Sequence, residues 1–263
     1  MANYSVSTQL RLGIRGIVMV FASLLGITIS AAILLLGAGL LLKKSRHGVV
    51  LAVAIGIGAM ALALLIQSIF QEIPFILVFE SAKSLSIASS RYVALQKEYP
   101  FEIAAFLGIM AGLWQEGMKL FAVKYRKAQD APRIGFGFAA VDIAVFVFGL
   151  LPGLSASGSA ASVGAFLLIG IVLQAPFSMM FHTGTAVFLK DGVARKKAPR
   201  NFFVAFLAHS YVDGMLDYVT IATVLLGFSY AAGELIVWIP STAIALIFLA
   251  YLVRHKDLEA VHD

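Results

Sequence analysis

The sequence predicts an all-α, polytopic membrane protein with seven transmembrane helices, an amino terminus outside the cell and a carboxyl terminus in the cytoplasm. Of its 263 residues, 60% are hydrophobic and only 13% are charged, whereas soluble domains carry about a quarter charged residues. A water-soluble fold of this length has too little interior to cover so much apolar surface, so we expect lipid to be the solvent. Residues 1–263 are therefore treated as a single multi-pass domain of the cell membrane.

Seven apolar runs support this class, because a helix needs about 20 apolar residues to cross the hydrocarbon. They cover residues 17–42, 48–70, 101–123, 134–152, 161–189, 202–227 and 231–253. Arg11 and Arg15 precede the first run as in a signal peptide. That run is longer than the apolar core of a signal peptide and lacks a small-residue cleavage site, so we expect a retained anchor. The segment 71–100 is expected to include a helix that lies at the membrane interface.

The basic residues orient the chain. Fourteen of the 20 Lys and Arg residues fall in segments on one side: Lys43, Lys44, Arg46, Lys124, Arg126, Lys127, Arg133, Lys190, Arg195, Lys196, Lys197, Arg200, Arg254 and Lys256. Five fall on the other side: Arg11, Arg15, Lys83, Arg91 and Lys97. Cytoplasmic loops are enriched in Lys and Arg, which places the amino terminus outside. The net charge of +6 therefore indicates topology and contact with membrane lipids, and we expect no nucleic-acid partner.

Several ionisable residues lie inside the predicted spans. They are Glu116 and Lys119 in the third span, Asp142 in the fourth, His182 in the fifth, and His209, Asp213 and Asp217 in the sixth. Such a side chain costs at least about 2.5 kcal/mol in hydrocarbon, so it usually has a partner or a function. The absence of cysteine excludes disulfides, thiolate metal sites and cysteine nucleophiles.

Four of these residues have the same predicted depth. Each lies eight or nine residues from a basic residue at the cytoplasmic boundary: Glu116 from Lys124, Asp142 from Arg133, His182 from Lys190 and His209 from Arg200. At about 1.5 Å per residue, all four lie roughly 12–14 Å below that boundary. Asp213 follows one turn later on the same helix face as His209. We therefore expect one shared polar site that opens towards the cytoplasm.

The residue types at this site are compatible with several kinds of chemistry. Two histidines with carboxylates suit a divalent metal such as zinc, held by Glu116, Asp142, His182 and His209 with water in an open position. Without metal, a carboxylate could act as general base on water. Proton or cation relay in a transporter and ordinary helix packing, in which Glu116 and Lys119 simply neutralise each other, are the alternatives. Gly108 and Gly112 also give the third span a face that permits close helix approach.

Short motifs around these residues resemble those of a large intramembrane superfamily. Gln115-Glu116-Gly117-Met118-Lys119 is similar to its first motif, Glu-Glu-x-x-Lys or Glu-Glu-x-x-x-Arg. The segment from Phe138 to Asp142 is similar to the second motif, Phe-x-x-x-Glu or Phe-x-x-x-His, and His182 to the third. The segment from His209 to Asp213 matches the final His-x-x-x-Asp pattern. The superfamily comprises CAAX prenyl endopeptidases, PrsW-type proteases, YhfC-type proteins and the anterior-pharynx-defective (Aph) subunit of gamma-secretase.

The resemblance covers about residues 101–220 and implies an intramembrane endopeptidase that hydrolyses membrane-embedded or membrane-proximal peptide bonds. In that interpretation Glu116 is the general base or metal-bound carboxylate, Asp142, His182 and His209 complete the water-activating site, and Asp213 orients His209 or supports the oxyanion. Two positions depart from the proteolytic members, which have Glu at the position of Gln115 and Glu or His at that of Asp142. The gamma-secretase subunit shares the Gln-Glu pair, seven spans and one His in each of the fifth and sixth spans. The alternative is therefore a non-catalytic scaffold that binds a partner helix.

Overall fold

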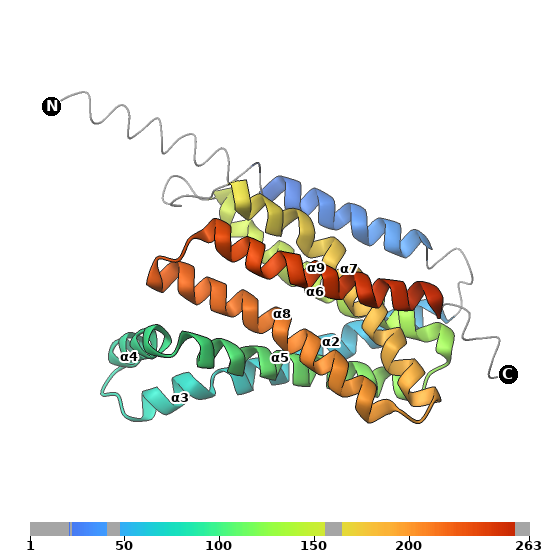
Figure 1. Ribbon diagram of the computed structural model, residues 1–263, viewed down its shortest axis with the longest axis horizontal. Helices are drawn as coiled ribbons and strands as arrows, with labels where there is room; N and C mark the ends of the chain where they lie inside the picture. Colours follow the sequence, from blue (N-terminus) through green and yellow to red (C-terminus); the bar gives the residue numbers. More distant parts are fainter. Residues whose placement is uncertain (1–20, 22, 41–47, 156–164, 256–263) are drawn as a thin grey trace.

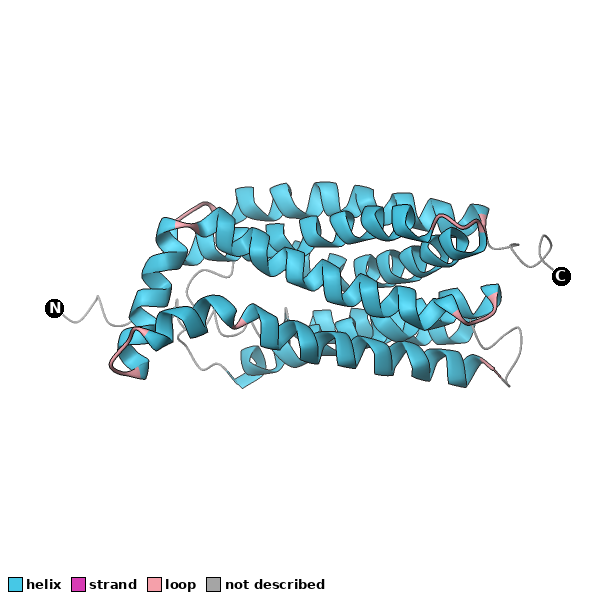
Figure 2. Cartoon of the chain, turned by 90° about the horizontal axis from the view of Figure 1, so that it is seen from below, coloured by secondary structure: helices cyan, strands magenta, loops and turns pink. Residues whose placement is uncertain are grey.

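The computed structural model describes residue 21 and residues 23–40, 48–155 and 165–255, and all regular elements in these ranges are helical. The predicted all-α class is confirmed for this part of the chain. Figures 1 and 2 show the long helices running beside one another along the long axis of the molecule. The helices are Ser23–Leu40, α2 (Val49–Gln71), α3 (Ile73–Glu80), α4 (Leu85–Glu98), α5 (Pro100–Lys124), α6 (Ala131–Ser155), α7 (Ala165–Ala194), α8 (Ala198–Leu226) and α9 (Tyr230–Arg254), with a 3₁₀ turn at Ala128–Asp130.

Five helical segments of the described chain are long and apolar enough to cross a membrane: Ser23–Leu40, Val49–Glu80, Ala128–Gly149, Gly170–Ala194 and Ala231–Arg254. Two of the seven predicted spans are not in this set. They form α5 and α8, which have 25 and 29 residues and carry Glu116, Lys119, His209, Asp213 and Asp217. These helices are as long as the others, but their ionisable side chains make them more polar.

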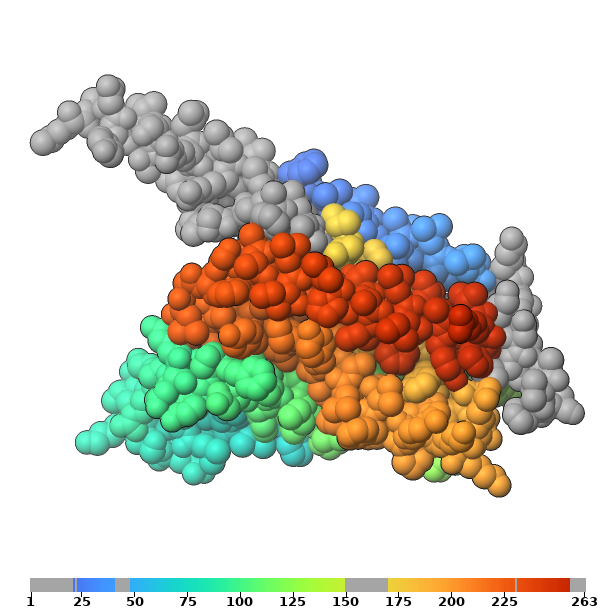
Figure 3. All heavy atoms as spheres, in the orientation of Figure 1, coloured from blue at the N-terminus to red at the C-terminus, as the bar shows by residue number. Residues whose placement is uncertain are grey.

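The predicted outer segment 71–100 forms two helices. In α3, Pro74 stands in the first turn, where its missing N–H is not needed. The Ser84 side chain accepts a hydrogen bond from the Ile87 N–H at 3.3 Å and so caps α4. Figures 1 and 3 show α3 and α4 together at one end of the molecule, beside the ends of α5 and α8. The ends of the predicted run 17–42 and the start of the run 161–189 lie outside the described residues.

Helices α5 and α8 form the most extensive helix–helix contact in the described chain. Two glycines of α5 permit it. A Cβ at Gly112 would lie 2.7 Å from the carbonyl oxygen of Phe206, and one at Gly108 would lie 2.6 Å from the Cα of Gly214. Real Cβ atoms do not approach backbone atoms this closely, so both positions require glycine at this spacing. The predicted small-residue face of the third span is therefore the face that packs on α8.

The α6–α7 contact has the same basis. A Cβ at Gly135 would lie 2.5 Å from the carbonyl oxygen of His182. On the other side of α7, a buried cluster of aromatic side chains, Phe177, Phe181, Trp238 and Phe248, joins this helix to α9. Close packing on both sides fixes the position of α7 and of its histidine.

Candidate functional site

The centre of the site is an ion pair within α5. The Lys119 Nζ lies 2.6 Å from Oε1 of Glu116, one helical turn earlier, and both side chains are 0% exposed. Residues three apart lie on the same face of a helix, which brings the two charges together. This face of α5 points into the bundle, where α7 and α8 supply the remaining partners.

Helix α7 contributes two partners to Lys119. The ammonium lies 3.0 Å from Nδ1 of His182 and donates a hydrogen bond to Oγ1 of Thr185 at 2.9 Å. The three hydrogens of the ammonium therefore have three neighbours: the carboxylate, the imidazole and the hydroxyl. His182 and Thr185 are buried as well.

Helix α8 supplies the second contact of Glu116. His209 Nδ1 lies 2.7 Å from Oε1 of Glu116, the same oxygen that receives Lys119. The other nitrogen of this ring, Nε2, lies 3.5 Å from Oδ2 of Asp213 in the next turn of α8. One imidazole thus lies between a fully buried carboxylate and a partly exposed one.

Helix α6 completes the site at the opposite end. Oδ2 of Asp142 lies 3.6 Å from Nε2 of His182 and accepts a hydrogen bond from the Ser178 hydroxyl at 2.6 Å. The side chains of Asp142 and Asp213 are each 28% exposed, whereas those between them are almost wholly buried. We call six side chains the buried network, in the order of their contacts: Asp142, His182, Lys119, Glu116, His209 and Asp213.

The structure thus brings together all five candidate residues of the sequence, Glu116, Asp142, His182, His209 and Asp213. Their catalytic role stays a prediction. The sequence interpretation did not assign the central position to Lys119, which it treated only as a neutralising neighbour of Glu116. The signal that could have revealed this position is the location of Lys119 one turn from Glu116 and five residues from Lys124, which places it about 7–8 Å inside the predicted boundary.

Aromatic rings surround the ammonium group. The Lys119 Nζ lies 5.1 Å from the ring centroid of Phe138 and 5.6 Å from that of Phe181. The Phe181 ring also packs edge-on against the His209 ring, with centroids 5.1 Å apart. These rings exclude water and offer their negative faces to the cation, so they strengthen the ion pair at the centre.

The predicted zinc site does not fit this arrangement. Among the described residues, no three His, Asp or Glu side chains are placed so that they could hold a metal ion together. Oε1 of Glu116 and Nδ1 of His182, which the prediction made metal ligands, both face the Lys119 Nζ. A cation is therefore already built into the chain at the place where the metal was expected.

The first residue of the Gln-Glu pair faces a different helix. The Gln115 Nε2 donates a hydrogen bond to Oε1 of Gln67 on α2 at 2.9 Å. The Gln67 Nε2 in turn donates a hydrogen bond to Oε1 of Gln71 at 3.3 Å, and the Gln71 Nε2 donates one to the carbonyl oxygen of Leu107 at 2.9 Å. These amides connect α2 to α5, and none of them is hydrogen-bonded to the buried network in the described part of the chain, so Gln115 has a packing role.

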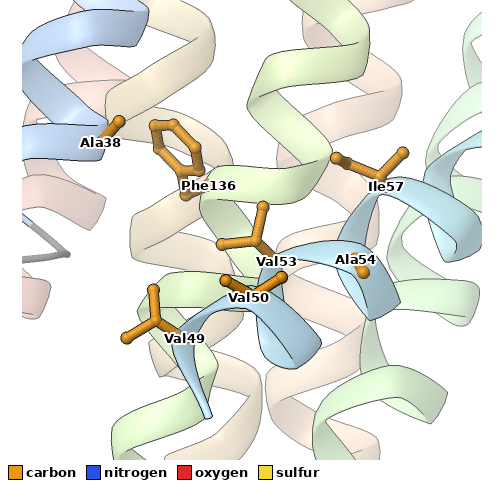
Figure 4. A pocket seen from close by; sticks show the side chains of 7 residues that line it. All are labelled: Ala38, Val49, Val50, Val53, Ala54, Ile57 and Phe136. Carbon is orange, nitrogen blue, oxygen red and sulfur yellow. The ribbon is translucent and has the colours of Figure 1, made fainter. Parts of the chain in front are cut away.

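Two further features bear on chemistry. Oε2 of Glu116 is buried and has no hydrogen-bond partner among the described residues. A cavity of about 270 Å³ lies elsewhere, between the helix Ser23–Leu40, α2 and α6, and is lined only by apolar side chains, among them Ala38, Val53, Ile57 and Phe136. Figure 4 shows these side chains pointing towards one another across the cavity, and none of them belongs to the buried network.

No protein-family model, curated protein or solved structure matches the chain.

Proposed function

We propose that this chain is a non-catalytic membrane scaffold that binds a partner transmembrane helix, with the architecture of the intramembrane superfamily whose motifs it resembles. In this proposal it crosses the cell membrane seven times, with its amino terminus outside. Helices α5 and α8 join the five apolar segments as spans, because their 25 and 29 residues exceed the roughly 20 needed. Glu116, Lys119, His209 and Asp213 are tolerated in these helices because they point into the bundle and pair with one another.

The observation that carries the proposal is the double engagement of one carboxylate oxygen. Oε1 of Glu116 contacts Lys119 at 2.6 Å and His209 at 2.7 Å, and the Glu116 side chain is 0% exposed. A general base must reach a water molecule and accept its proton. A carboxylate that compensates a buried ammonium is poorly suited to that task, whereas it joins α5 to α8 through His209 and, by way of Lys119, to α7.

Gln115 supports the same conclusion. The proteolytic members of the resembled superfamily have a carboxylate at this position, and here an amide points away from the site to Gln67. The chain therefore lacks one of the two acidic groups and uses the position to hold α2. The side chains of both Gln115 and Glu116 thus form contacts between helices.

The experiment is a paired measurement on wild type and Glu116→Gln. The scaffold proposal predicts that purified wild type hydrolyses membrane-embedded peptide reporters no faster than the variant does. It also predicts that the variant unfolds at a lower temperature, because Lys119 loses its counter-charge. Hydrolysis by wild type that disappears in Glu116→Gln, with folding preserved, would instead establish an intramembrane endopeptidase.

Peptide hydrolysis is the second candidate, and one observation favours it. Oε2 of Glu116 has no hydrogen-bond partner among the described residues. Buried polar atoms of this kind are usually hydrogen-bonded to a ligand or a water molecule when the protein offers no partner. If a water molecule reaches this oxygen, Glu116 would accept its proton, and His209 and Asp213 would help to stabilise the charge. Asp142 and His182 would then position the substrate or hold Lys119 in place.

A further inference from the structure

One end of the bundle gathers basic residues from two different turns. There the end of α5 and the 3₁₀ turn meet the end of α7 and the start of α8. The ammonium of Lys190 on α7 donates hydrogen bonds to the carbonyl oxygens of Lys124, the last residue of α5, and of Arg126, which follows α5. Asn201 of α8 donates to the carbonyl oxygen of Phe188 at 2.7 Å. These contacts hold the two turns side by side, so their cations share one surface.

The two acidic residues that the structure describes in these turns are buried and already paired. Asp130 lies 3.3 Å from both Arg126 and Arg133, and Asp191 lies 2.7 Å from Arg195. Asp130 and Asp191 are only 5% and 4% exposed. In the two turns and the first turn of α8, five further cations are exposed, and none of them forms an ion pair with an acidic residue of the described chain: Lys124, Lys127, Lys196, Lys197 and Arg200. We call these five residues the basic surface.

Exposed aromatic side chains border the basic surface. Phe121 and Tyr125, at the end of α5, are 65% and 74% exposed, and Phe203, in the first turns of α8, is 57% exposed. The Lys124 Nζ lies 5.1 Å from the centroid of the Tyr125 ring. Aromatic rings next to lysine and arginine are typical of the boundary between hydrocarbon and head groups. We therefore expect the basic surface to lie at the depth of the lipid phosphates.

We propose that the basic surface binds the head groups of anionic phospholipids. The lysine ammonium groups would donate hydrogen bonds to phosphate oxygens, and the net negative charge of the head group would balance cations that no acidic residue of the described chain balances. A zwitterionic head group carries its own cation, so its electrostatic attraction to the basic surface is much weaker. The interaction depends on the membrane-embedded position of the chain and not on the buried network, so it holds for a scaffold and for a peptidase alike.

The test uses the purified protein in nanodiscs of phosphatidylcholine, with and without phosphatidylglycerol. Thermal unfolding is followed as phosphatidylglycerol increases, for wild type, for Lys124→Gln/Lys127→Gln/Lys197→Gln and for the control Lys83→Gln/Lys97→Gln, whose lysines are exposed at the opposite end. Each removed cation should weaken the apparent affinity roughly fivefold. The triple variant should therefore need about two orders of magnitude more anionic lipid, and the control should behave as wild type.

Three results would overturn the proposal. The first is equal stabilisation by both lipids, and the second is an equal loss in the control and the triple variant. The third is full stabilisation by free glycerol phosphate without anionic lipid, because the surface would then recognise a soluble anion and not the membrane. Loss of the phosphatidylglycerol effect at high salt supports the proposal, because exposed charges are screened within about 8–10 Å at ordinary ionic strength.

Discussion

The ammonium of Lys119 lies 2.6 Å from Oε1 of Glu116, and neither side chain is exposed. Two opposite charges in an interior of low dielectric constant depend on each other, because either one alone would be uncompensated. The same carboxylate oxygen also contacts His209 of α8, and the same ammonium contacts His182 of α7. A single pair in one helix thus determines how three helices meet.

Gly112 provides a test of the α5–α8 contact. Gly112→Leu places a side chain against the backbone of Phe206 and the hydroxyl of Ser210, so the helices must separate. We expect a loss of about 1–3 kcal/mol in the free energy of unfolding, as for other overpacked cores. Gly58→Leu is the control, because no atom lies within 4 Å of a Cβ there. Equal losses at both positions, measured by unfolding in detergent, would contradict the close approach of α5 and α8.

Gln115 provides a test of the amide chain between α2 and α5. Gln115→Glu removes the donor to Gln67 and sets a carboxylate oxygen against the oxygen of that amide. We expect a loss of about 1–3 kcal/mol in unfolding free energy, the cost of an unsatisfied buried polar group. No hydrolytic activity should appear. Gln129→Glu, at an exposed position before α6, should leave stability unchanged. A stable, hydrolytic Gln115→Glu variant would mean that this glutamine faces the buried network.

The proposed orientation predicts which surface residues a membrane-impermeant thiol reagent can reach. The chain has no native cysteine, so the reagent can label only the single cysteine that is introduced. Ser89→Cys on α4 should be labelled in intact cells, whereas Ala194→Cys at the end of α7 should be labelled only after permeabilisation; both positions are exposed. The reverse pattern would invert the topology. Labelling of both residues from outside would contradict the number of spans between them.

The common depth of four ionisable residues could be predicted from the sequence, because helices rise by a constant distance per residue. Glu116, Asp142, His182 and His209 lie at similar distances from basic boundary residues, and the structure joins these side chains, with Lys119, in one series of contacts. The spacing of four between His209 and Asp213 predicted their shared face in the same way.

The partners of individual side chains could not be predicted in this way. Lys119 has a long, flexible side chain, and its ammonium reaches His182 and Thr185 only because α7 approaches α5 closely. Gln115 and Glu116 are adjacent in sequence, yet helical geometry turns them about 100° apart, and this sends one to α2 and the other to α8. Such contacts depend on which helices are neighbours, and a single sequence does not specify that.

A double-mutant cycle on Glu116 and Lys119 tests the central claim, that the buried network acts as one paired structural unit. The free energy of unfolding is measured for wild type, Glu116→Gln, Lys119→Met and the double variant, with Lys83→Met as an exposed control. Each single variant leaves one buried charge uncompensated and should lose about 3–5 kcal/mol. The double variant removes both charges and should lose far less than the sum, while the control stays near wild type. Losses that add to within about 0.5 kcal/mol would show that the two residues act independently, and would contradict the account.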